Sequence, residues 1–442
     1  MKLGRDTLGV FTTNAFNVVL SLGNSIFLTR VLGVEGRGEF AVFAAALGLL
    51  ALVLGFGLDV SVRYFVARGD VPRERILTSL VLWVGAASLL VFAAARANDV
   101  WFGSELFLPA SRQTPLYEGV LAAAVGFTLL FGNISSVFAG MRSFGVINAM
   151  TLFSTALAMA VYGGMFFLER AGRADLGSGQ VFVAYMALQA ASAGILVWLG
   201  YRRLGLRFSA SFLDGALLAA MVRYAAKAYG ANLAQFLNYR ADIWIVQFFL
   251  GSVALGLYSL AAGLVMMLWI LPRATATVLL PAVAAEEEGV GFAEAARLAR
   301  VVLAVTVAGA VALAVTAAWW IPLLYGRDFA PSAGAFAVLL VGGAPFALSI
   351  VLASVLAGVD RVGLNLAGSL VGLVVTVALD LLLIPRYGIA GAAWASSASY
   401  LATTAVAVAA FSRVGGIAPL RCMLVRPADF AFVWRGLKGL PR

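Results

Sequence analysis

The polar residues between Arg223 and Asp242 are those whose types and spacing could do chemistry in this chain. If the apolar run that ends near Phe249 spans a bilayer, about twenty residues of helix reach back to about residue 229. Asn238, Arg240 and Asp242 would then lie near the middle of the membrane, where a charge costs several kcal/mol unless it is paired or faces water. We therefore expect a polar cavity here, with bases that bind an anion and an acid that binds a proton or cation.

The spacing of these residues on a helix defines the polar face more closely. Most of them fall within roughly 120° of a helical wheel, while Arg240 points elsewhere and cannot pair well with Asp242, two residues away. Arg223 and Lys227 have an alternative role as snorkelling anchors at the cytoplasmic headgroups. We assign Asp242 to ion coupling. The substrate-binding set from this helix is Arg223, Lys227, Asn232, Gln235, Asn238 and Arg240.

Three charged residues outside this helix are of the types that could bind an anion or couple an ion. Arg273 follows Pro272, which lacks a backbone N–H and should kink its helix, and we add this arginine to the substrate-binding set. Asp380 lies within an apolar segment, and Asp59 is placed to pair with Arg63 four residues on. Both acids are candidates for ion coupling. A proton or sodium ion is the one small ligand we expect, with no organic cofactor and no metal centre.

A stripe of amides occupies the first apolar segment. Asn14, Asn17, Ser21 and Asn24 lie within about 80° of a helical wheel, so they share one face. We expect the three asparagines to line the same cavity and to bind substrate. The alternative is that they only hydrogen-bond to neighbouring helices, as amides in membrane helices often do.

The composition of the chain identifies its class. Hydrophobic residues make up 62% of the sequence and charged residues 12%, with a mean hydropathy of +0.98. Soluble domains are about a quarter charged, so this is a polytopic membrane protein. One cysteine, Cys422, and no histidine exclude an intrachain disulfide, a His/Cys metal site and a histidine general base. The net charge of +10 is explained by cytoplasmic loops rather than by nucleic acid.

Apolar segments divide the chain into about twelve predicted spans, so we expect an all-α integral membrane protein. With the N-terminus inside, most lysines and arginines fall on the inner side, which places both termini in the cytoplasm. The spans are 8–29, 40–62, 76–95, 117–138, 146–168, 179–200, 223–249, 257–280, 301–322, 334–356, 364–384 and 389–411.

An internal repeat supports this topology. At an offset of 218 residues, Leu32-Gly33 falls on Leu250-Gly251, and Ala139-Gly140 falls on Ala357-Gly358. The halves should therefore be two six-helix bundles of the same orientation, with substrate between them. We place the bundles at 1–212 and 213–412, followed by a basic cytoplasmic tail, 413–442, whose aromatic and basic residues after Pro427 suggest an interfacial helix on anionic lipid.

Two motifs resemble a known family. The pattern Leu-Gly-x4-Gly-x-Phe/Tyr at Leu32 and Leu250, and the stretch from Leu381 to Gly391, are similar to the polysaccharide-export branch of the multidrug/oligosaccharidyl-lipid/polysaccharide (MOP) exporter superfamily. The resemblance covers Asn14 to about Phe411. It implies two bundles of six helices that work by alternating access, as in flippases of O-antigen repeat units for lipopolysaccharide and other surface polysaccharides.

The expected function is therefore transport rather than enzymatic catalysis. The resemblance implies a flippase in the plasma membrane of a bacterium or archaeon. It would move an undecaprenyl pyrophosphate-linked oligosaccharide from the cytoplasmic to the outer leaflet, with glycan polymerase or ligase proteins as partners. Alternatives are a lipid II flippase, although those typically carry two further spans, and a cation-coupled multidrug exporter, which would favour unpaired acids. A membrane-embedded glycan polymerase is disfavoured because the longest outer loop, 96–116, is short.

Overall fold

The computed structural model describes residues 2–69, 71–205, 214–284, 291–426 and 429. Within these ranges the chain is helical and contains no β-strand, and nine of its helices are long and apolar enough to cross a membrane. The protein is thus an all-α, multi-pass membrane protein, as the composition predicts. The expected interfacial helix after Pro427 and Lys438 in the tail lie outside the described residues.

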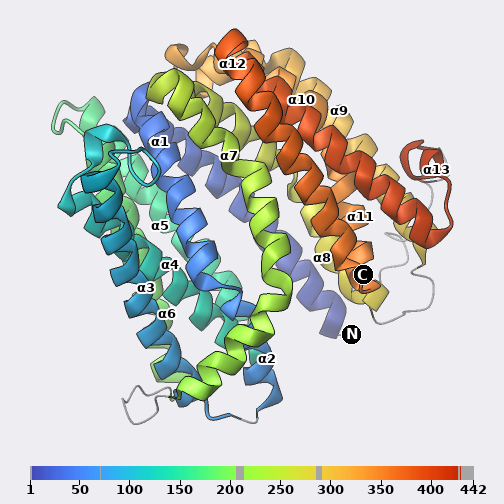
Figure 1. Cartoon of the computed structure of the whole chain (residues 1–442), viewed down its shortest axis with the longest axis horizontal. Coiled ribbons are helices and arrows are strands. Elements are labelled where there is room, and N and C mark those ends of the chain that lie inside the picture. The colour runs from blue at the N-terminus through green and yellow to red at the C-terminus, as the bar shows by residue number, and fades with distance from the viewer. Residues whose placement is uncertain (1, 70, 206–213, 285–290, 427–428, 430–442) are drawn as a thin grey trace. The chain divides into compact units, whose positions relative to one another are not determined.

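The chain divides into two compact units, Met1–Leu233 and Ala234–Arg442, and the division falls within helix α7. Figure 1 draws the first unit in blue to green, with α3 to α6 gathered beside α1. Its elements are α1 (Lys2–Gly55), α2 (Leu58–Arg68), α3 (Arg73–Trp101), the short η1 (Ala110–Arg112), α4 (Pro115–Gly140), α5 (Phe144–Arg170), α6 (Ser178–Leu204) and the start of α7 (Gly215–Leu268).

The second unit takes the rest of α7 and everything after it. It contains one pair of short helices, α10 and α11, where the first unit has the longer α4, and its last described helix is a small one beside α9. Its further elements are α8 (Ile270–Ala284), α9 (Phe292–Tyr325), η3 (Arg327–Phe329), α10 (Ser332–Gly343), α11 (Phe346–Gly358), α12 (Val362–Gly415) and α13 (Pro419–Met423).

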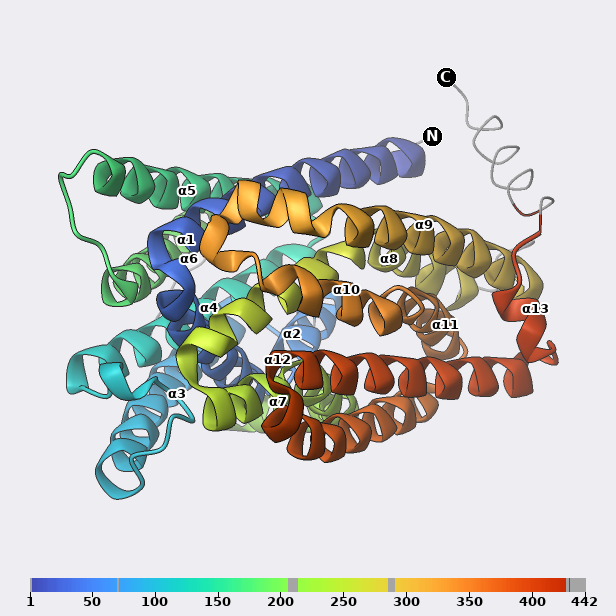
Figure 2. The same cartoon turned by 90° about the horizontal axis from the view of Figure 1, so that it is seen from above.

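Three of the long helices are folded at a glycine. Gly33 in α1, Gly251 in α7 and Gly388 in α12 have φ angles of 62°, 75° and 60°, a left-handed conformation that glycine adopts without a Cβ penalty. In Figure 2 the two segments of α12 lie side by side as a hairpin. A Cβ on Gly391 would clash with the Leu383 carbonyl, so this glycine permits the close return of the chain. Each folded helix carries two expected spans, which reconciles nine helices with twelve spans within the described ranges.

The internal repeat is visible in the backbone. Gly33 and Gly251 are 218 residues apart, and so are Arg142 and Asp360, two of the few residues other than glycine with positive φ, at 58° and 59°. The equivalents of α4 and α5 are the α10–α11 pair and the first segment of α12, which begin and end at nearly the same offset. The predicted internal repeat is therefore present in the backbone of the two units.

One helix is continuous in the first unit and broken in the second. Where α4 is continuous, α10 ends at Gly343 and α11 begins at Phe346, after Pro345. The chain also breaks between α7 and α8 at Trp269, one turn before Pro272, because proline cannot donate a hydrogen bond to the preceding turn. The kink expected from this proline is thus present.

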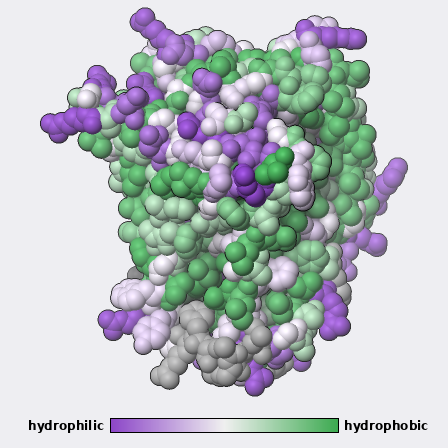
Figure 3. Space-filling view, turned by 60° about the vertical axis from the view of Figure 1, so that its left-hand side comes forward, coloured by the Kyte–Doolittle hydropathy of each residue, from purple (hydrophilic) through white to green (hydrophobic). Residues whose placement is uncertain are grey.

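The surface agrees with a membrane protein. Figure 3 shows one face on which hydrophobic residues predominate across the middle and hydrophilic residues gather toward the two ends. Many large apolar side chains are exposed on the described chain, such as Leu89 in α3 and Val315 in α9, at 73% and 78%. Apolar exposure of this extent is expected where lipid tails replace water.

Candidate functional site

Asp242 is the centre of a buried polar cluster in the second unit. It lies on α7 with 3% of its surface exposed, and its Oδ2 accepts hydrogen bonds from the Tyr258 hydroxyl and from Ser396 Oγ, the latter at 3.4 Å. The Tyr258 and Ser396 hydroxyl oxygens are 2.9 Å apart. Its other oxygen, Oδ1, is buried and has no hydrogen-bond partner among the described residues.

A second carboxylate, Asp380, lies in the same unit and interacts electrostatically with Asp242. It comes from the first segment of α12, is 0% exposed, and neither of its oxygens has a hydrogen-bond partner within the described part of the chain. Two buried carboxylates in mutual range cannot both remain ionised without a counter-charge. Arg240 interacts electrostatically with Asp242, and the oxygens of Asp242 and Asp380 have the donor chemistry to bind a proton or a cation.

Asn238 continues the cluster one helical turn before Asp242. Its Oδ1 accepts from Ser399 Oγ at 2.8 Å and from Thr376 Oγ1 at 3.4 Å, so it joins α7 to both segments of α12. A Cβ at Gly372 would come within 2.6 Å of the Asn238 amide nitrogen, which shows how closely these helices pack. Asn238 is thus buried in the helix interface, next to the acid pair.

The other polar residues of α7 lie differently. Asn232 and Gln235 are exposed, and Gln235 Nε2 donates to the Tyr239 hydroxyl at 2.7 Å. Arg240 is partly exposed and interacts electrostatically with Asp242. The expected polar face is therefore divided into a buried part that contains acids and amides and an exposed part that contains Asn232 and Gln235.

Arg273 of α8 is exposed, with its guanidinium carbon 5.8 Å from the centre of the Trp269 ring. It also interacts electrostatically with Tyr239, so it belongs with Gln235 and Tyr239 in space. Neither Arg273 nor Arg240 forms an ion pair with any carboxylate of the described residues. Both bases thus lack a direct contact with a carboxylate of the described chain.

The remaining predicted residues are in the first unit. Asn17 and Asn24 are partly buried on α1, each with an Oδ1 that has no partner in the described chain. Arg223 is exposed next to Tyr224, which stacks on Tyr64 of α2 at 4.5 Å. The side chains of Asn14 and Lys227 lie outside the described residues.

Asp59 has a different setting from the two buried acids. Its carboxylate accepts from Arg63 Nη2 at 2.7 Å, and 44% of its side chain is exposed. The local pair expected from the i, i+4 spacing is confirmed. Arg63 also reaches Ser136 of α4 through its Nε at 3.4 Å.

Several residues of the cluster are absent from the predicted sites. Tyr258 belongs to the repeated glycine motif, which indicated a structural turn, yet its hydroxyl bonds Asp242 where the first half has Phe40. Ser396 and Ser399 come from the run Ser-Ser-Ala-Ser in the last span. Hydroxyls spaced three residues apart on one face of an apolar helix are the signal that could have indicated them.

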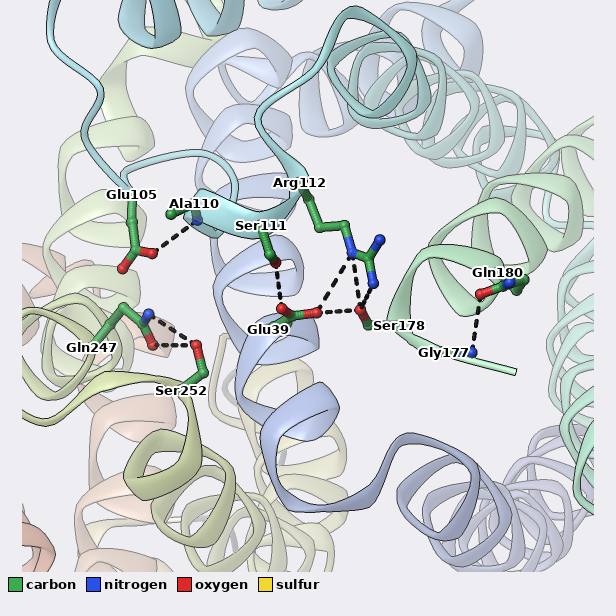
Figure 4. Close-up of polar contacts among 10 residues, drawn as sticks. All are labelled: Glu39, Glu105, Ala110, Ser111, Arg112, Gly177, Ser178, Gln180, Gln247 and Ser252. Carbon is green, nitrogen blue, oxygen red and sulfur yellow. Dashed lines mark hydrogen bonds and ion pairs between the residues drawn. The ribbon is translucent and has the colours of Figure 1, made fainter. Parts of the chain in front are cut away.

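The first unit has a buried carboxylate of another kind, drawn in Figure 4. Glu39 of α1 accepts hydrogen bonds from Ser111 at one oxygen and from Ser178 at the other, and Arg112 Nε lies 3.7 Å from its Oε2. Arg112 also donates to Ser178 Oγ, at 3.0 Å from Nη2 and 3.2 Å from Nε. This cluster joins α1, η1 and α6, and sequence reasoning missed it.

Comparisons with known proteins agree with this fold. Residues 176–334 match a family model described as a polysaccharide biosynthesis protein. The probable low-salt glycan biosynthesis flippase Agl15 of Haloferax volcanii is 30% identical over 93 residues, which is 21% of this chain and 20% of that protein. The match therefore spans about a fifth of this relative's length.

Solved structures are similar over nearly the whole chain. The lipid II flippase MurJ in an inward closed conformation aligns with a TM-score of 0.73 and 11% identity, covering 98% of this chain and 93% of that one. An inward-facing multidrug resistance MATE family transporter of the MOP superfamily gives 0.71 and 13%, covering 90% and 94%. The chain therefore has the fold of these solved transporters, and the match over residues 176–334 supports the predicted resemblance to a polysaccharide-export family.

Proposed function

We propose that this protein is a flippase that moves an undecaprenyl pyrophosphate-linked oligosaccharide from the cytoplasmic to the outer leaflet, coupled to a proton or sodium ion. One observation carries the proposal. The second unit combines two bases that form no direct ion pair with a carboxylate of the described chain, Arg240 and Arg273, with a buried acid pair of which three oxygens have no hydrogen-bond partner there. The bases supply anion recognition, and the acids supply a coupling site.

The substrate class follows from the chemistry of the exposed groups. A pyrophosphate carries several negative charges, and arginine binds phosphate oxygens through a planar fork of N–H donors. Arg273 and Arg240 are the described bases of the second unit's spans that can do this, and Gln235 and Asn232 add amides suited to sugar hydroxyls. Arg223, Lys227, Asn14, Asn17 and Asn24 extend the proposed substrate set into the first unit.

The coupling site is Asp242 with Asp380, supported by Tyr258 and Ser396. Binding of a proton or sodium ion removes repulsion between the two carboxylates, so the ion gradient can bias the packing of α7 against α12. Asp59 is a weaker member of the proposed coupling set, because Arg63 already neutralises it.

Two other transport functions are separated from this one by the same residues. A lipid II flippase would use the same anion-binding bases and differ in the glycan. A cation-coupled drug exporter would need unpaired acids in contact with its cargo, whereas the unpaired acids here are fully buried and the exposed groups are basic. The lipid II flippase thus differs from our proposal only in the glycan that is recognised. The drug exporter is disfavoured because the exposed groups are basic and would repel a cationic drug.

The decisive experiment is a flipping assay in proteoliposomes with purified full-length protein. The substrate is a fluorescent oligosaccharide on undecaprenyl pyrophosphate, and lipid II and a cationic dye are the comparison substrates. Arg273→Gln should lower the rate about tenfold or more by removing a charged hydrogen-bond donor. The control is Arg361→Gln, an exposed arginine at the start of α12, which should leave the rate unchanged. Transport of the dye alone would refute the proposal.

The cellular setting is proposed along with the function. We place the protein in the plasma membrane of a bacterium or archaeon, with both termini cytoplasmic and with glycan polymerase or ligase proteins acting on its product. Single cysteines in a Cys422→Ser background test the orientation. Asp360→Cys should react with an impermeant thiol reagent from the inside, and Arg327→Cys from the outside. The reverse pattern would refute the orientation.

A further inference from the structure

Four aromatic rings form a continuous cluster between the acid pair and Arg273. Trp269 lies at the centre, with ring-centre distances of 5.5 Å to Tyr239, 4.9 Å to Phe346 and 5.3 Å to Tyr400. These rings come from α7, the α7–α8 break, α11 and α12. Trp269 is fully buried although it sits at a helix break, so the cluster fills the interior where four helical segments meet.

Trp269 is held in place by a specific hydrogen bond. Its indole N–H donates to the Gly343 carbonyl at 2.7 Å. Gly343 is the last residue of α10, and carbonyls at a helix end have no partner within the helix. The two helix breaks of the second unit are therefore joined through one side chain, and a shift of either break would move the tryptophan.

Arg273 lies on one side of this tryptophan. Its guanidinium carbon is 5.8 Å from the ring centre, and its backbone N–H donates to the Trp269 carbonyl at 3.0 Å. A guanidinium that is held by the face of an aromatic ring keeps its in-plane N–H groups free for an anion. The position of Trp269 therefore decides where Arg273 presents those donors.

The acid pair adjoins the cluster at Tyr400. Tyr400 contacts Trp269 and interacts electrostatically with both Asp242 and Asp380. The other polar and charged groups that face the pair are Tyr258, Ser396 and Arg240. Tyr400 is thus the residue of the aromatic cluster that both contacts Trp269 and interacts with the two acids.

We propose that Trp269 is the positioning residue through which the buried acid pair controls Arg273. The inference rests on the proposed function and adds the regulation of its anion-binding base. With a proton or cation bound, α7 and α12 pack closely, and Tyr400 supports Trp269 beneath Arg273. With the pair charged, repulsion between Asp242 and Asp380 loosens that packing, so Trp269 and Arg273 move together.

The first test needs no substrate. Arg273→Cys in a Cys422→Ser background reports the surroundings of position 273 through its rate of reaction with a charged thiol reagent. The rate should change about fivefold or more between conditions that neutralise the acid pair and conditions that do not, varied by pH and by sodium concentration. Asp360→Cys is the matched control, because this exposed residue follows the C-terminal end of α11, whereas the cluster residue Phe346 is at its N-terminal end.

Variants at the cluster then decide the role of the tryptophan. Trp269→Leu should make the labelling rate at position 273 independent of pH and sodium. Asp380→Asn should hold that labelling rate at the value seen when the acid pair is neutralised. Tyr400→Phe keeps the ring and should retain the dependence, whereas Tyr400→Leu should lose it, which covers the case in which Trp269→Leu fails to fold. Persistence of the dependence in a folded Trp269→Leu or Tyr400→Leu protein overturns the proposal, as does its absence from the parent.

The second test is binding of farnesyl pyrophosphate to the full-length protein. The dissociation constant of farnesyl pyrophosphate should change with pH or sodium by some factor. Bound farnesyl pyrophosphate should change the affinity for the proton or sodium ion by the same factor, because coupling is reciprocal. Trp269→Leu should bind each ligand but lose this factor, a result that a merely structural role would not produce. If position 273 responds to ions but the pyrophosphate does not bind, the positioning role stands and the proposed substrate is wrong.

Discussion

The Glu39 cluster of the first unit and the Asp242–Asp380 pair of the second are both buried and acidic, but they differ in their partners. Both oxygens of Glu39 accept hydrogen bonds, and Arg112 supplies the opposite charge. Three of the four oxygens of Asp242 and Asp380 have no hydrogen-bond partner among the described residues. A buried charge is tolerated when it is paired, so the first cluster is complete and the second is not.

This difference supports our proposal that Glu39 is a structural acid and that Asp242 and Asp380 are functional ones. A satisfied carboxylate joins elements of the fold, as Glu39 joins α1, η1 and α6. An unsatisfied buried carboxylate lowers the stability of the fold unless a bound ion neutralises it. Such carboxylates are found where ion binding serves the function of the protein. Proteins of this size are only marginally stable, so an uncompensated pair of this kind needs a functional reason.

The repeat makes the comparison sharper. The position of Asp242 is occupied in the first half by Asn24, and the position of Asp380 by Tyr162. In the opposite direction, Glu39 is matched by Leu257, whose carbonyl accepts a hydrogen bond from Ser332 at 2.9 Å. The two halves therefore differ in which of these equivalent positions carries a carboxylate, and our proposal places ion coupling at the positions of the second half.

The largest effect is expected from neutralising the unsatisfied pair. Asp380→Asn and Asp242→Asn should each abolish the response of flipping to the ion gradient, while the melting temperature stays level or rises because a buried repulsion is removed. Flipping with and without an imposed gradient, together with thermal melting, measures both quantities. A stable variant with full gradient dependence would show that the coupling site lies elsewhere.

Disrupting the Glu39 cluster should have the opposite effect, namely a lower melting temperature with gradient dependence kept. Glu39→Ala leaves Arg112 without its carboxylate and removes the acceptor of two serines, at a cost of about 3 kcal/mol, the lower end for a buried pair. Thermal melting should fall clearly, while gradient dependence per folded molecule is retained. Ser111→Ala, which removes one exposed donor, is the mild control. Loss of gradient dependence in a folded Glu39→Ala protein would contradict the division into structural and functional acids.

A third acid, Asp429, extends the comparison to the tail. Arg300 of α9 donates to both of its oxygens, at 2.6 and 2.7 Å, and this pairing lowers the pKa of Asp429 below its ordinary 3.8. A lowered pKa contributes stability that is complete above 3.8 and is lost as the pH falls through the folded value.

Asp429→Asn should therefore lower the melting temperature near neutral pH, by less than Glu39→Ala does. Its difference from the parent should shrink as the pH falls below 3.8. The measurement is thermal melting against pH in detergent. A difference that is constant with pH would mean that the carboxylate charge of Asp429 is not what holds the tail segment to α9.

Much of the fold could be predicted from the sequence because bilayer thickness and glycine conformation are local constraints. Gly33 and Gly251 mark their turns by type alone, and Pro272 marks the break that follows Leu268. The partners of Asp242 could not be predicted in this way. Tyr258 and Ser396 are brought to it by the packing of α7 on α12, and hydroxyls in apolar helices have many local partners.

The same reason explains the missed and misplaced residues. A helical wheel placed Asn238, Gln235 and Asp242 on one wet face, but it contains no information on which part of that face another helix covers. The α12 hairpin covers Asn238 and Asp242, so Gln235 alone remains exposed. The Glu39 cluster depends on residues up to 139 positions apart in the chain, for which a single sequence offers no signal.

The smallest effect is expected at Asp59, the acid that is neither buried nor unsatisfied. Exposed i, i+4 pairs contribute about 0.2–1 kcal/mol, so Asp59→Asn should shift thermal melting only slightly. If coupling requires an unsatisfied buried acid, its gradient dependence should equal that of the parent. A combined Asp59→Asn, Arg63→Gln protein controls for the arginine left unpaired by the single change. Should Asp59→Asn weaken gradient dependence as strongly as Asp380→Asn, an exposed and paired acid would be part of the coupling site, and the rule drawn from Glu39 and Asp380 would not hold for this protein.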